Sequence, residues 1–485
     1  MIIPSFEVAK RLSKDSTLVP IALEIFSDQK TPIDILRNIR RHGGSCFILE
    51  SVNSGERWGR YTFLGYEPIM SVCGTGNSVV IKKGVTETVV ERNAMEVLRE
   101  LAAKYKSMRN QGLPPFAGGF VGYFAYDFVR HSIPGLKPHA RNDEGFRDFH
   151  LLLIDKVIVF DHFRQKLYII VNVPSENIGV SYIKGVERLK DIERMIINGS
   201  LPAEEPSLCG EFSAHFTEGD FKKMVLKVKS HIVEGDIFQA AVSNRFKAPF
   251  RGSLINVYRA LRTINPSPYM VYMRLDDMEI ACSSTEALAT LRDGEVSSFP
   301  LAGTCPRGKT KEEDAALKEV LLHDEKELAE HDMLVDLARN DVGKVSRFGS
   351  VKVREYRQIK QFSHVSHISS HVTGELREGA DAFDVIAATL PAGTLSGTPK
   401  KRASEIIDEV EGTKRGVYGG AIGYVDFAGN MDMCIGVRTA VLKAENVYVQ
   451  AGAWIVADSV PEREYRETNH KAMAVMRALK EGERV

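Results

Sequence analysis

The stretch on which the fold and the candidate site depend is HDEKELAEHDMLVDLARND, residues 323–341. Its apolar spacing predicts a helix, in which Glu327, Glu330 and His331 lie on one face because residues three and four apart are neighbours. Asp324 is placed to cap the N-terminus, and apolar side chains such as Leu334 supply the buried side. Taken alone, this pattern is also typical of a solvated, charged helix face.

A second segment near the C-terminus repeats the arrangement. Glu464 and Glu467 are three residues apart, and Lys471 follows one turn later. Two glutamate-bearing helices that face each other would surround a hard divalent cation with carboxylate oxygens, and Mg2+ is the first choice. The sequence therefore predicts a Mg2+ site with four candidate ligands, Glu327, Glu330, Glu464 and Glu467.

The composition argues against several classes of protein. Of the 485 residues 44% are hydrophobic, and the 64 basic and 64 acidic residues cancel. A net charge of zero does not favour nucleic-acid binding, and the chain shows no basic arm. The six cysteines have no metal-binding spacing, which indicates free thiols in a reducing compartment. Since there is neither a signal-peptide pattern nor an apolar run of membrane-spanning length, we expect a cytoplasmic protein without membrane contact.

Helix and strand patterns mix along the chain without strict alternation, which favours an α+β fold over a doubly wound sheet. Residues 31–41 predict a short amphipathic helix capped by Thr31. LLLIDKVIVFD (151–161) and KLYIIVNV (166–173) predict a buried hairpin. The proline- and glutamate-rich segment 202–206 is the best linker candidate. We therefore expect an N-terminal α+β region at 1–205 and a second domain at 206–485.

Beyond this linker, polar residues interrupt apolar strands in a way that core packing does not require. The segments are GDIFQAAVSNRF (235–246), SSTEALATL (283–291), FPLAGTCPRG (299–308), HVSHIS (364–369) and LPAGTLSGTPKKRASEIIDEVE (390–411). They place Gln239, Glu286 and His367 at or beside predicted strands, and Pro399 at the start of a predicted helix. A loop, a helix cap or a hydrogen-bonded interior histidine would explain each segment by itself.

Together, these segments resemble those of the chorismate-utilising enzymes. The other matching motifs are NPSPYM (265–270), KELAEHDMLVDLARND (326–341), RGVYGGAIGYVDFAGNMDMCIGVRTA (415–440) and VQAGAWIVADSVPEREYRETNHKA (449–472). Within this family the chain is most similar to component I, the large subunit, of anthranilate synthase. The resemblance implies a two-sheet sandwich of mixed, largely antiparallel strands with helices covering the outside. It also implies a lyase that converts chorismate and ammonia to anthranilate and pyruvate in tryptophan biosynthesis.

The resemblance implies a role for each residue that matches a family motif. The magnesium ligands would be Glu330 and Glu467, with Glu327 and Glu464 completing an acidic wall. Glu286 would protonate the departing ring hydroxyl, and His367 would remove the ring proton as pyruvate leaves. The implied substrate-binding residues are Gly303, Thr304, Thr394, Tyr418, Arg438, Gly452, Ala453, Trp454 and Lys471.

Two positions separate the branches of this family. Members that add water carry a lysine where this chain has Gln239, and a glutamine cannot activate water as a base. Aminodeoxychorismate synthases carry a nucleophilic lysine where this chain has Ala302. Both residues indicate anthranilate as the product. The chain departs from the family pattern at Thr285 (usually proline), at Cys305 (commonly arginine) and at Trp454, usually a glycine whose amide meets a substrate carboxylate.

The resemblance also implies regulation and a partner. LES (49–51) and RYTFLG (60–65) are similar to the part of the family that binds the feedback inhibitor tryptophan together with NPSPYM. The implied contacts are Leu49, Glu50, Ser51, Pro268, Tyr269 and Met270. Glu50 would meet the ammonium group of the inhibitor; a strand edge packed on a proline-rich turn is the alternative. No segment resembles a glutaminase, so a glutamine amidotransferase small subunit, component II, is the implied partner and ammonia source.

Two alternative functions stay open at this point. The first is component I of aminodeoxychorismate synthase, which identification of the product separates from anthranilate synthase. The second is a tryptophan-sensing or scaffold subunit without catalysis. The complete set of chemical groups argues against the second alternative: Glu286, Glu330, His367, Arg438 and Glu467.

Overall fold

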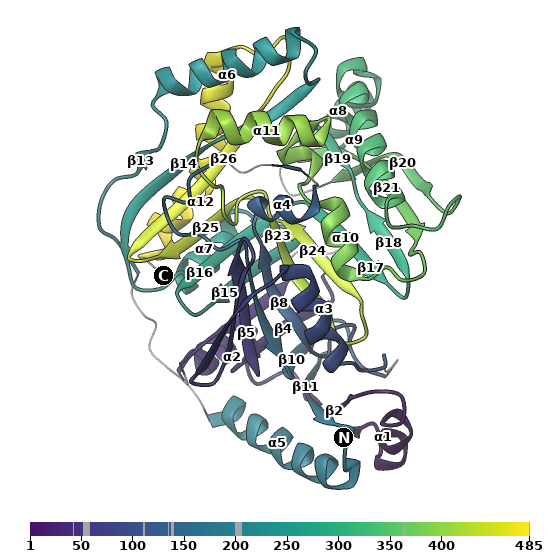
Figure 1. The fold of residues 1–485 in the computed structure, drawn as a ribbon. Coiled ribbons are helices and arrows are strands. Elements are labelled where there is room, and N and C mark those ends of the chain that lie inside the picture. The colour runs from purple at the N-terminus through teal and green to yellow at the C-terminus, as the bar shows by residue number, and fades with distance from the viewer. Residues whose placement is uncertain are drawn as a thin grey trace.

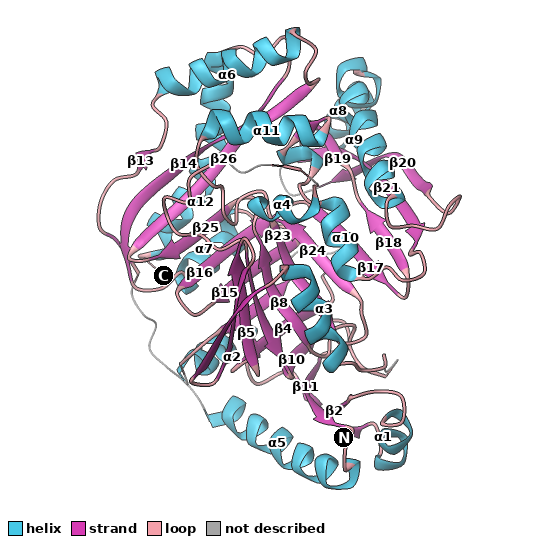
Figure 2. Cartoon of the chain, viewed as in Figure 1, coloured by secondary structure: helices cyan, strands magenta, loops and turns pink. Residues whose placement is uncertain are grey.

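The protein is a sandwich of two large β-sheets with helices on the outside (Figures 1 and 2). The computed structural model describes residues 1–41, 43–51, 59–109, 112–133, 135–136, 140–198, 206–361 and 365–484. Within these ranges the named strands pair antiparallel, and a parallel contact occurs only as the isolated bridge between Arg141 and Thr413. The expected α+β sandwich is confirmed, with antiparallel pairing throughout its ladders.

The first sheet runs through both halves of the chain. In spatial order its strands are β1 (Ile2–Ile3), β2 (Leu18–Phe26), β11 (Lys166–Pro174), β10 (Lys156–Asp161), β4 (Tyr61–Tyr66), β3 (Cys46–Glu50), β15 (Tyr269–Arg274), β16 (Met278–Ser284), β25 (Thr439–Lys443), β26 (Asn446–Ile455), β14 (Gln239–Arg251) and β12 (Ser207–Leu208). Two short strands, β13 (Ser213–Ala214) and β22 (Gly397–Thr398), also pair with β14.

The second sheet is built in the same way. Its spatial order is β19 (Leu301–Pro306), β21 (Val365–Glu375), β18 (Glu295–Ser298), β17 (Ala287–Arg292), β24 (Met431–Ile435), β23 (Ala421–Asp426), β8 (Gly119–Phe124), β9 (Phe149–Ile154), β5 (Met70–Thr75), β6 (Ser78–Lys83) and β7 (Thr86–Glu91). β20 (Lys352–Gln361) pairs with β21.

The helices are α1 (Phe6–Leu12), α2 (Pro32–Arg41), α3 (Ala94–Lys104), α4 (Val129–Ser132), α5 (Ile178–Asn198), α6 (Glu218–Val233), α7 (Ile255–Ile264), α8 (Lys311–His323), α9 (Glu325–Gly343), α10 (Ala382–Thr389), α11 (Lys400–Glu411) and α12 (Pro461–Gly482). Short 3-10 turns occur at Tyr126–Phe128 and Gly393–Leu395. The helix predicted at 323–341 is α9, and its cap is Asp324, whose side chain accepts from the amides of Lys326 and Glu327. Among the described helices, none combines the length and the apolar character needed to span a membrane.

Three apolar layers hold the sandwich together. The central layer lies between the sheets and contains Phe47 and Ile280 of the first sheet with Val121 and Leu152 of the second. The outer face of the first sheet packs on α2, α5, α7 and α12, and the outer face of the second packs on α3, α9 and α10. The helices therefore bury one face each, as their amphipathic patterns predict.

The two halves of the sequence share both sheets. β3 pairs with β15 in the first sheet, and β8 pairs with β23 in the second. The predicted linker lies outside the described residues except for Pro206, so the division after residue 205 stays a prediction. The hairpin prediction for 151–173 is wrong in part: β9 and β10 are separate strands, and the chain changes sheets between them at Asp155. Only β10 and β11 form the hairpin.

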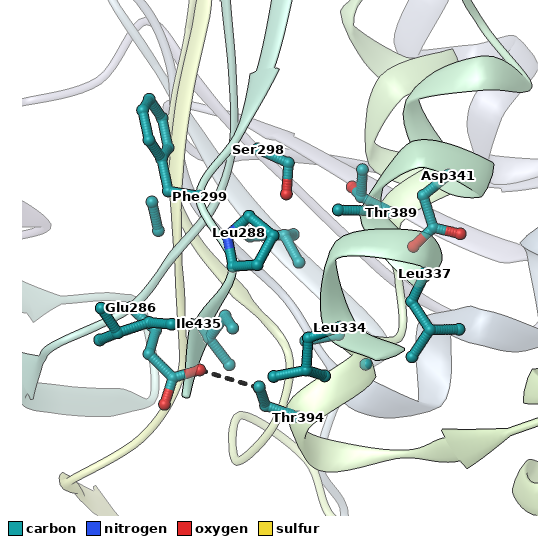
Figure 3. Close-up of a pocket in the computed structure, with 16 residues that line it drawn as sticks. Glu286, Leu288, Ser298, Phe299, Leu334, Leu337, Asp341, Thr389, Thr394 and Ile435 are labelled. Carbon is teal, nitrogen blue, oxygen red and sulfur yellow. Dashed lines mark hydrogen bonds between the residues drawn. The ribbon is translucent and has the colours of Figure 1, made fainter. Parts of the chain in front are cut away.

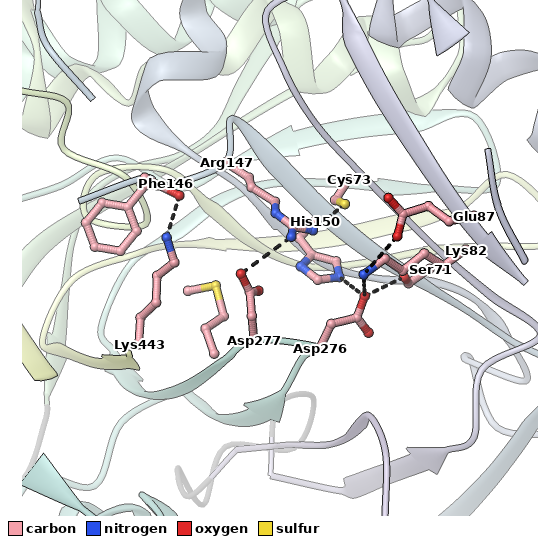
Figure 4. A network of polar contacts seen from close by, with 12 residues as sticks. Ser71, Cys73, Lys82, Glu87, Phe146, Arg147, His150, Asp276, Asp277 and Lys443 are labelled. Atoms are coloured by element: carbon pink, nitrogen blue, oxygen red, sulfur yellow. Dashed lines mark hydrogen bonds and ion pairs between the residues drawn. The ribbon is translucent and has the colours of Figure 1, made fainter. Parts of the chain in front are cut away.

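A network of polar contacts ties the two sheets together (Figure 4). The turn between β15 and β16 carries Asp276, which accepts from Ser71 of β5 at 3.0 Å and pairs with Lys82 of β6 at 3.5 Å. His150 of β9 is fully buried beside Asp276, and burial lowers its pKa to about 4. This contact fixes the far end of the β15–β16 hairpin, whose near end leads into the candidate site.

Candidate active site

The candidate active site lies where the chain crosses twice between the sheets. β16 leads through Glu286 into β17, and β24 leads through Arg438 into β25. Because β16 pairs with β25 and β17 pairs with β24, the two crossings are adjacent. The Ser283 amide donates to the Arg438 carbonyl at 3.2 Å, and the Ile435 amide donates to the Glu286 carbonyl at 3.0 Å. A carboxyl group and a guanidinium group therefore emerge from one gap in the sandwich.

Glu286 and Thr394 meet at one end of a pocket between the second sheet and α9 (Figure 3). The Thr394 hydroxyl donates to Oε2 of Glu286 at 2.8 Å, and Leu334 of α9 lies across the pocket. Burial raises the pKa of Glu286, while the Thr394 hydrogen bond and the charges of Arg438 and Lys471 oppose that shift. A raised pKa is what a carboxyl group needs in order to act as a general acid.

A β-bulge orients His367 on β21. The pairing of β19 with β21 shifts register at Gly303, whose φ is +71°, and the Gly303 carbonyl lies 3.0 Å from Nδ1 of His367. The Thr304 hydroxyl is also 3.0 Å from Nδ1. Because a carbonyl can only accept, Nδ1 carries the proton, and Nε2 of the neutral ring carries the lone pair. Burial lowers the pKa of His367, which keeps the ring in this neutral form.

The four predicted metal ligands form one electrostatic group on α9 and α12. Burial raises the pKa of Glu330, and the negative charges of Glu327 and Glu467 raise it further. Burial and the charge of Glu467 also raise the pKa of Glu464. Lys471 opposes both shifts and pairs with Glu467 at 2.6 Å. A carboxyl group whose pKa is raised by neighbouring carboxylates lacks positive charge around it, which a divalent cation supplies.

The carboxylates of the acidic wall lie farther apart than the ligands of a fully formed metal site. Within the part of the chain that the structure describes, three candidate ligand atoms come within 4.8 Å of one another only at His231, Glu234 and Asp236. Asp236 already pairs with Arg402 at 2.7 Å, and that charge disfavours a cation there. Mg2+ is usually held by one or two carboxylates together with substrate oxygens and water. The wider wall of α9 and α12 fits that mode of binding.

The end of β26 supplies an open strand edge beside this wall. The pairing of β26 with β25 ends at Val449, and Lys471 donates to the Gly452 carbonyl at 3.2 Å on the free edge. Since the amide and carbonyl of a strand residue point the same way, the Gly452 amide faces this edge and that of Ala453 faces β14. A Cβ on Gly452 would lie 3.0 Å from the Tyr418 hydroxyl. The structure thus leaves one of the two predicted carboxylate-binding amides available, Gly452.

Two residues that hold the site together were not predicted. Asn265 accepts a hydrogen bond from Nη1 of Arg438 at 3.3 Å. Arg415 donates to the carbonyls of Leu395 and Ala241, each at 2.7 Å, and so joins the loop that carries Thr394 to β14. In the sequence both residues stand inside longer motifs, and no local pattern marks them because their contacts are distant along the chain.

His331 does not join the site, although it shares a helix face with Glu330 in the sequence pattern. Its ring is fully buried, and Nε2 lies 2.7 Å from the Ser370 hydroxyl on β21. Burial lowers its pKa to about 4. His331 is therefore a neutral interior residue that anchors α9 to the second sheet.

The residues predicted to bind tryptophan adjoin one another. Glu50 pairs with Met270 across β3 and β15, so the two motifs are neighbours. The Glu50 carboxylate lies 2.6 Å from Arg262 and accepts from Tyr258 at 2.5 Å. It therefore has partners within the chain, which differs from the expectation that it meets a ligand's ammonium group. The remaining predicted contacts are on the same two segments: Leu49, Ser51, Pro268 and Tyr269.

Comparison with known proteins identifies the class to which this fold and site belong. A sequence profile of the chorismate binding enzymes matches residues 45–477. The solved structure of anthranilate synthase component I from Streptococcus pneumoniae is 34% identical, covers 93% of this chain and 98% of its own, and superposes with a TM-score of 0.78. The menaquinone-specific isochorismate synthase of Escherichia coli shares the fold, with a TM-score of 0.70 at 18% identity and 98% coverage of both chains.

Relatives in sequence show to which group within this class the chain is most alike. Anthranilate synthase component 1 of Acetivibrio thermocellus is 44% identical over 99% of both chains, and that of Aquifex aeolicus is 41% identical over 98% of this chain and 97% of its own. The chain therefore belongs to the chorismate binding enzymes, within the anthranilate synthase component I group.

Proposed function

We propose that this protein is the large subunit of an anthranilate synthase, which converts chorismate and ammonia to anthranilate and pyruvate. The observation that carries the proposal is the convergence of an acid, a base, a guanidinium group and an acidic wall at one gap in the sandwich. Arg438 influences the pKa of both Glu286 and His367, and Lys471 influences the pKa of both Glu286 and Glu330. These groups therefore share one electrostatic environment.

The substrate is a dicarboxylate, and the site offers two kinds of anion binding. Glu330 and Glu467 would hold Mg2+, which supplies charge neutralisation at the ring carboxylate. Arg438, the Tyr418 hydroxyl and the Gly452 amide would bind the other carboxylate, since a guanidinium fork and backbone amides suit it. Lys471 lies between these two sets, bonded to both Glu467 and the Gly452 carbonyl.

Glu286 and His367 divide the proton transfers. Ammonia attacks the ring carbon next to the one that bears the ring carboxylate. The ring double bonds shift as the hydroxyl departs, and Glu286 gives its proton to this leaving group. His367 then takes the ring proton as pyruvate is eliminated and the ring becomes aromatic. The raised pKa of Glu286 and the lowered pKa of His367 are the directions that these two roles need.

Two side chains support ammonia as the nucleophile. Gln239 begins β14 and has no basic group with which to activate water. Ala302 on β19 has no nucleophile that could form a covalent adduct, as aminodeoxychorismate synthases require. We propose that the ammonia comes from a glutamine amidotransferase partner. We also propose a cytoplasmic location, which the six free cysteines support.

Feedback inhibition by tryptophan is a separate part of the proposal. The adjoining LES and NPSPYM segments support it, and Asn265 links NPSPYM to the catalytic Arg438. Inhibitor bound at this hairpin would therefore act on the arginine through one hydrogen bond. Titration of tryptophan against the initial rate tests this part, and full activity at saturating tryptophan would remove it.

The two proton-transfer roles are tested by substitution. His367→Ala should stall the reaction at the amino intermediate, which still carries its enolpyruvyl group and is separable by mass. Glu286→Gln should slow the consumption of chorismate itself, by roughly 10²- to 10⁴-fold, because the leaving hydroxyl loses its acid. His323→Ala, at an exposed histidine of α8, is the matched control and should behave as the wild type. Pyruvate release at the wild-type rate from His367→Ala would refute the assignment.

A further inference from the structure

Trp454 lies on the face of β26 that adjoins the candidate site. Side chains two residues apart on a strand share a face, so Trp454 lies on the same face of β26 as Gly452, which adjoins the Tyr418 hydroxyl. Ala453 and Ile455 alternate with it and fill the core behind the sheet. The large side chain therefore stands on the side of the substrate, where the smaller residue of the family pattern would leave space.

The ring of Trp454 packs against residues that adjoin the pocket. It packs against Ala302 of β19 and against Leu334 and Leu337 of α9. The same two leucines line the pocket that ends at Glu286 (Figure 3). Trp454 thus connects β26 with β19 and the acidic helix α9 through apolar contacts.

The indole nitrogen of Trp454 is buried and has no hydrogen-bond partner among the described residues. Gln239 lies on the same face of the sheet, two residues from Ala241, which pairs with Trp454, and its Nε2 is also buried without a partner there. Buried donors in folded proteins are nearly always paired, and leaving one unpaired is costly. Both donors lie on the face of the sheet that adjoins the candidate site, where a bound ligand would supply the missing acceptor.

We propose that the indole N–H of Trp454 donates a hydrogen bond to an anionic oxygen of the bound substrate. An indole nitrogen can only donate, so its partner must be an acceptor. Arg438 and Lys471, whose charges both act on Glu286, make this an environment that attracts an anion. The inference rests on the proposed function for the identity of the substrate, chorismate, whose carboxylates offer such oxygens. Trp454 is then a substrate-binding residue that adds a side-chain donor to the open edge of β26.

The direct test observes the proton itself. The chain has two tryptophans, so protein labelled with ¹⁵N-tryptophan gives two indole resonances, which Trp58→Phe assigns. Chorismate is titrated with Mg2+ but without ammonium or glutaminase, so that no amination occurs. The indole proton of Trp454 should move downfield and saturate together with the binding isotherm measured by calorimetry. A resonance that stays in place while chorismate binds would overturn the proposal.

A substitution of Trp454 distinguishes the hydrogen bond of the indole N–H from the packing of the aromatic ring. Trp454→Phe keeps an aromatic side chain against Leu334 and removes the N–H, and it should weaken chorismate binding by roughly tenfold. Thermal unfolding of the same variant reports its packing separately. An unchanged Kd for Trp454→Phe would show that the ring only packs. Absence of chorismate binding by the wild type would refute the proposed function as well, whereas normal turnover with an unshifted Trp454 resonance would refute the role of Trp454 alone.

Discussion

At the scale of single residues, the orientation of His367 depends on one glycine. Gly303 adopts φ +71°, and a Cβ there would lie 3.0 Å from Cδ1 of Ile368, the residue next to His367. Gly303→Ala should therefore cost about 1–3 kcal/mol of stability and shift the carbonyl that orients the imidazole. We expect kcat to fall roughly 10- to 100-fold with a smaller change in the KM for chorismate.

The matched control is Gly294→Ala, at the β17–β18 turn. Its φ is +82° and no atom lies within 4 Å of the added Cβ, so the backbone penalty is similar without contact at the site. Steady-state kinetics and thermal unfolding of both variants check the prediction. Equal kcat in the two variants would show that the bulge does not position His367.

His331 gives a pH-dependent stability. Its pKa is about 4 in the folded protein, against 6.5 for an ordinary histidine, so the unfolded chain binds the proton first as the pH falls. The neutral ring stabilises the fold above pH 6.5, and this contribution is lost between pH 6.5 and 4, by up to about 3 kcal/mol. His331→Gln can still donate to Ser370 and should lack this loss. Denaturant unfolding of both proteins at pH 7 and pH 4.5 checks the difference, which would be absent if His331 titrated normally.

The sequence can suggest a chemical role for a residue, but it cannot show which distant residues contact it. The carboxyl of Glu286 and the imidazole of His367 stand at strand boundaries where a local pattern can mark them. The partners of Asn265 and Arg415 are distant in sequence, so no local pattern could mark them as anchors. Glu50 has the charge expected of an inhibitor contact, but Arg262 and Tyr258 already bind it, and only the fold shows this.

At the scale of elements, α9 and α12 act as a pair. Glu330 carries a raised pKa because it is buried and lies near Glu327 and Glu467. Removing its charge should therefore leave the metal-free protein at least as stable as the wild type at pH 7. With Mg2+ the wild type should become the more stable of the two proteins. A ligand that binds only the folded state stabilises it by about 2.7 kcal/mol at 100 times its Kd.

The measurement is thermal unfolding of the wild type and Glu330→Gln with and without Mg2+. Glu325→Gln is the control, because Glu325 is exposed at the start of the same helix and should keep the full response to Mg2+. An equal rise in Tm for the wild type and Glu330→Gln would show that Mg2+ does not bind at this wall.

Helices with a clear period of apolar residues could be predicted from the sequence. The points at which the chain passes from one sheet to the other could not. The boundaries of α2, α9 and α11 follow from their apolar spacing and caps. The run LLLIDKVIVFD is apolar on both sides of Asp155. Its local pattern is therefore the same whether it forms one buried strand or two strands in different sheets. Which of them forms is decided by pairing with β4 and β8, residues that lie far away in the sequence.

At the scale of the whole molecule, the two halves of the chain depend on each other. β3 and β8 of the N-terminal half each pair with a strand of the C-terminal half, and the central apolar layer contains residues of both. Residues 206–485 expressed alone should therefore expose this layer and fail to unfold cooperatively. Circular dichroism and thermal melts of the fragment check this, and a sharp transition at the wild-type Tm would instead support two independent domains.

We propose that this sandwich brings acid, base and metal-binding carboxylates together to aminate and aromatise chorismate. The most direct measurement incubates the purified protein with chorismate, Mg2+ and ammonium at alkaline pH, and identifies the products by mass and fluorescence. We expect anthranilate and pyruvate in equal amounts, with no reaction when Mg2+ is chelated. Chorismate left unconsumed, or aminodeoxychorismate or isochorismate as the final product, would contradict it.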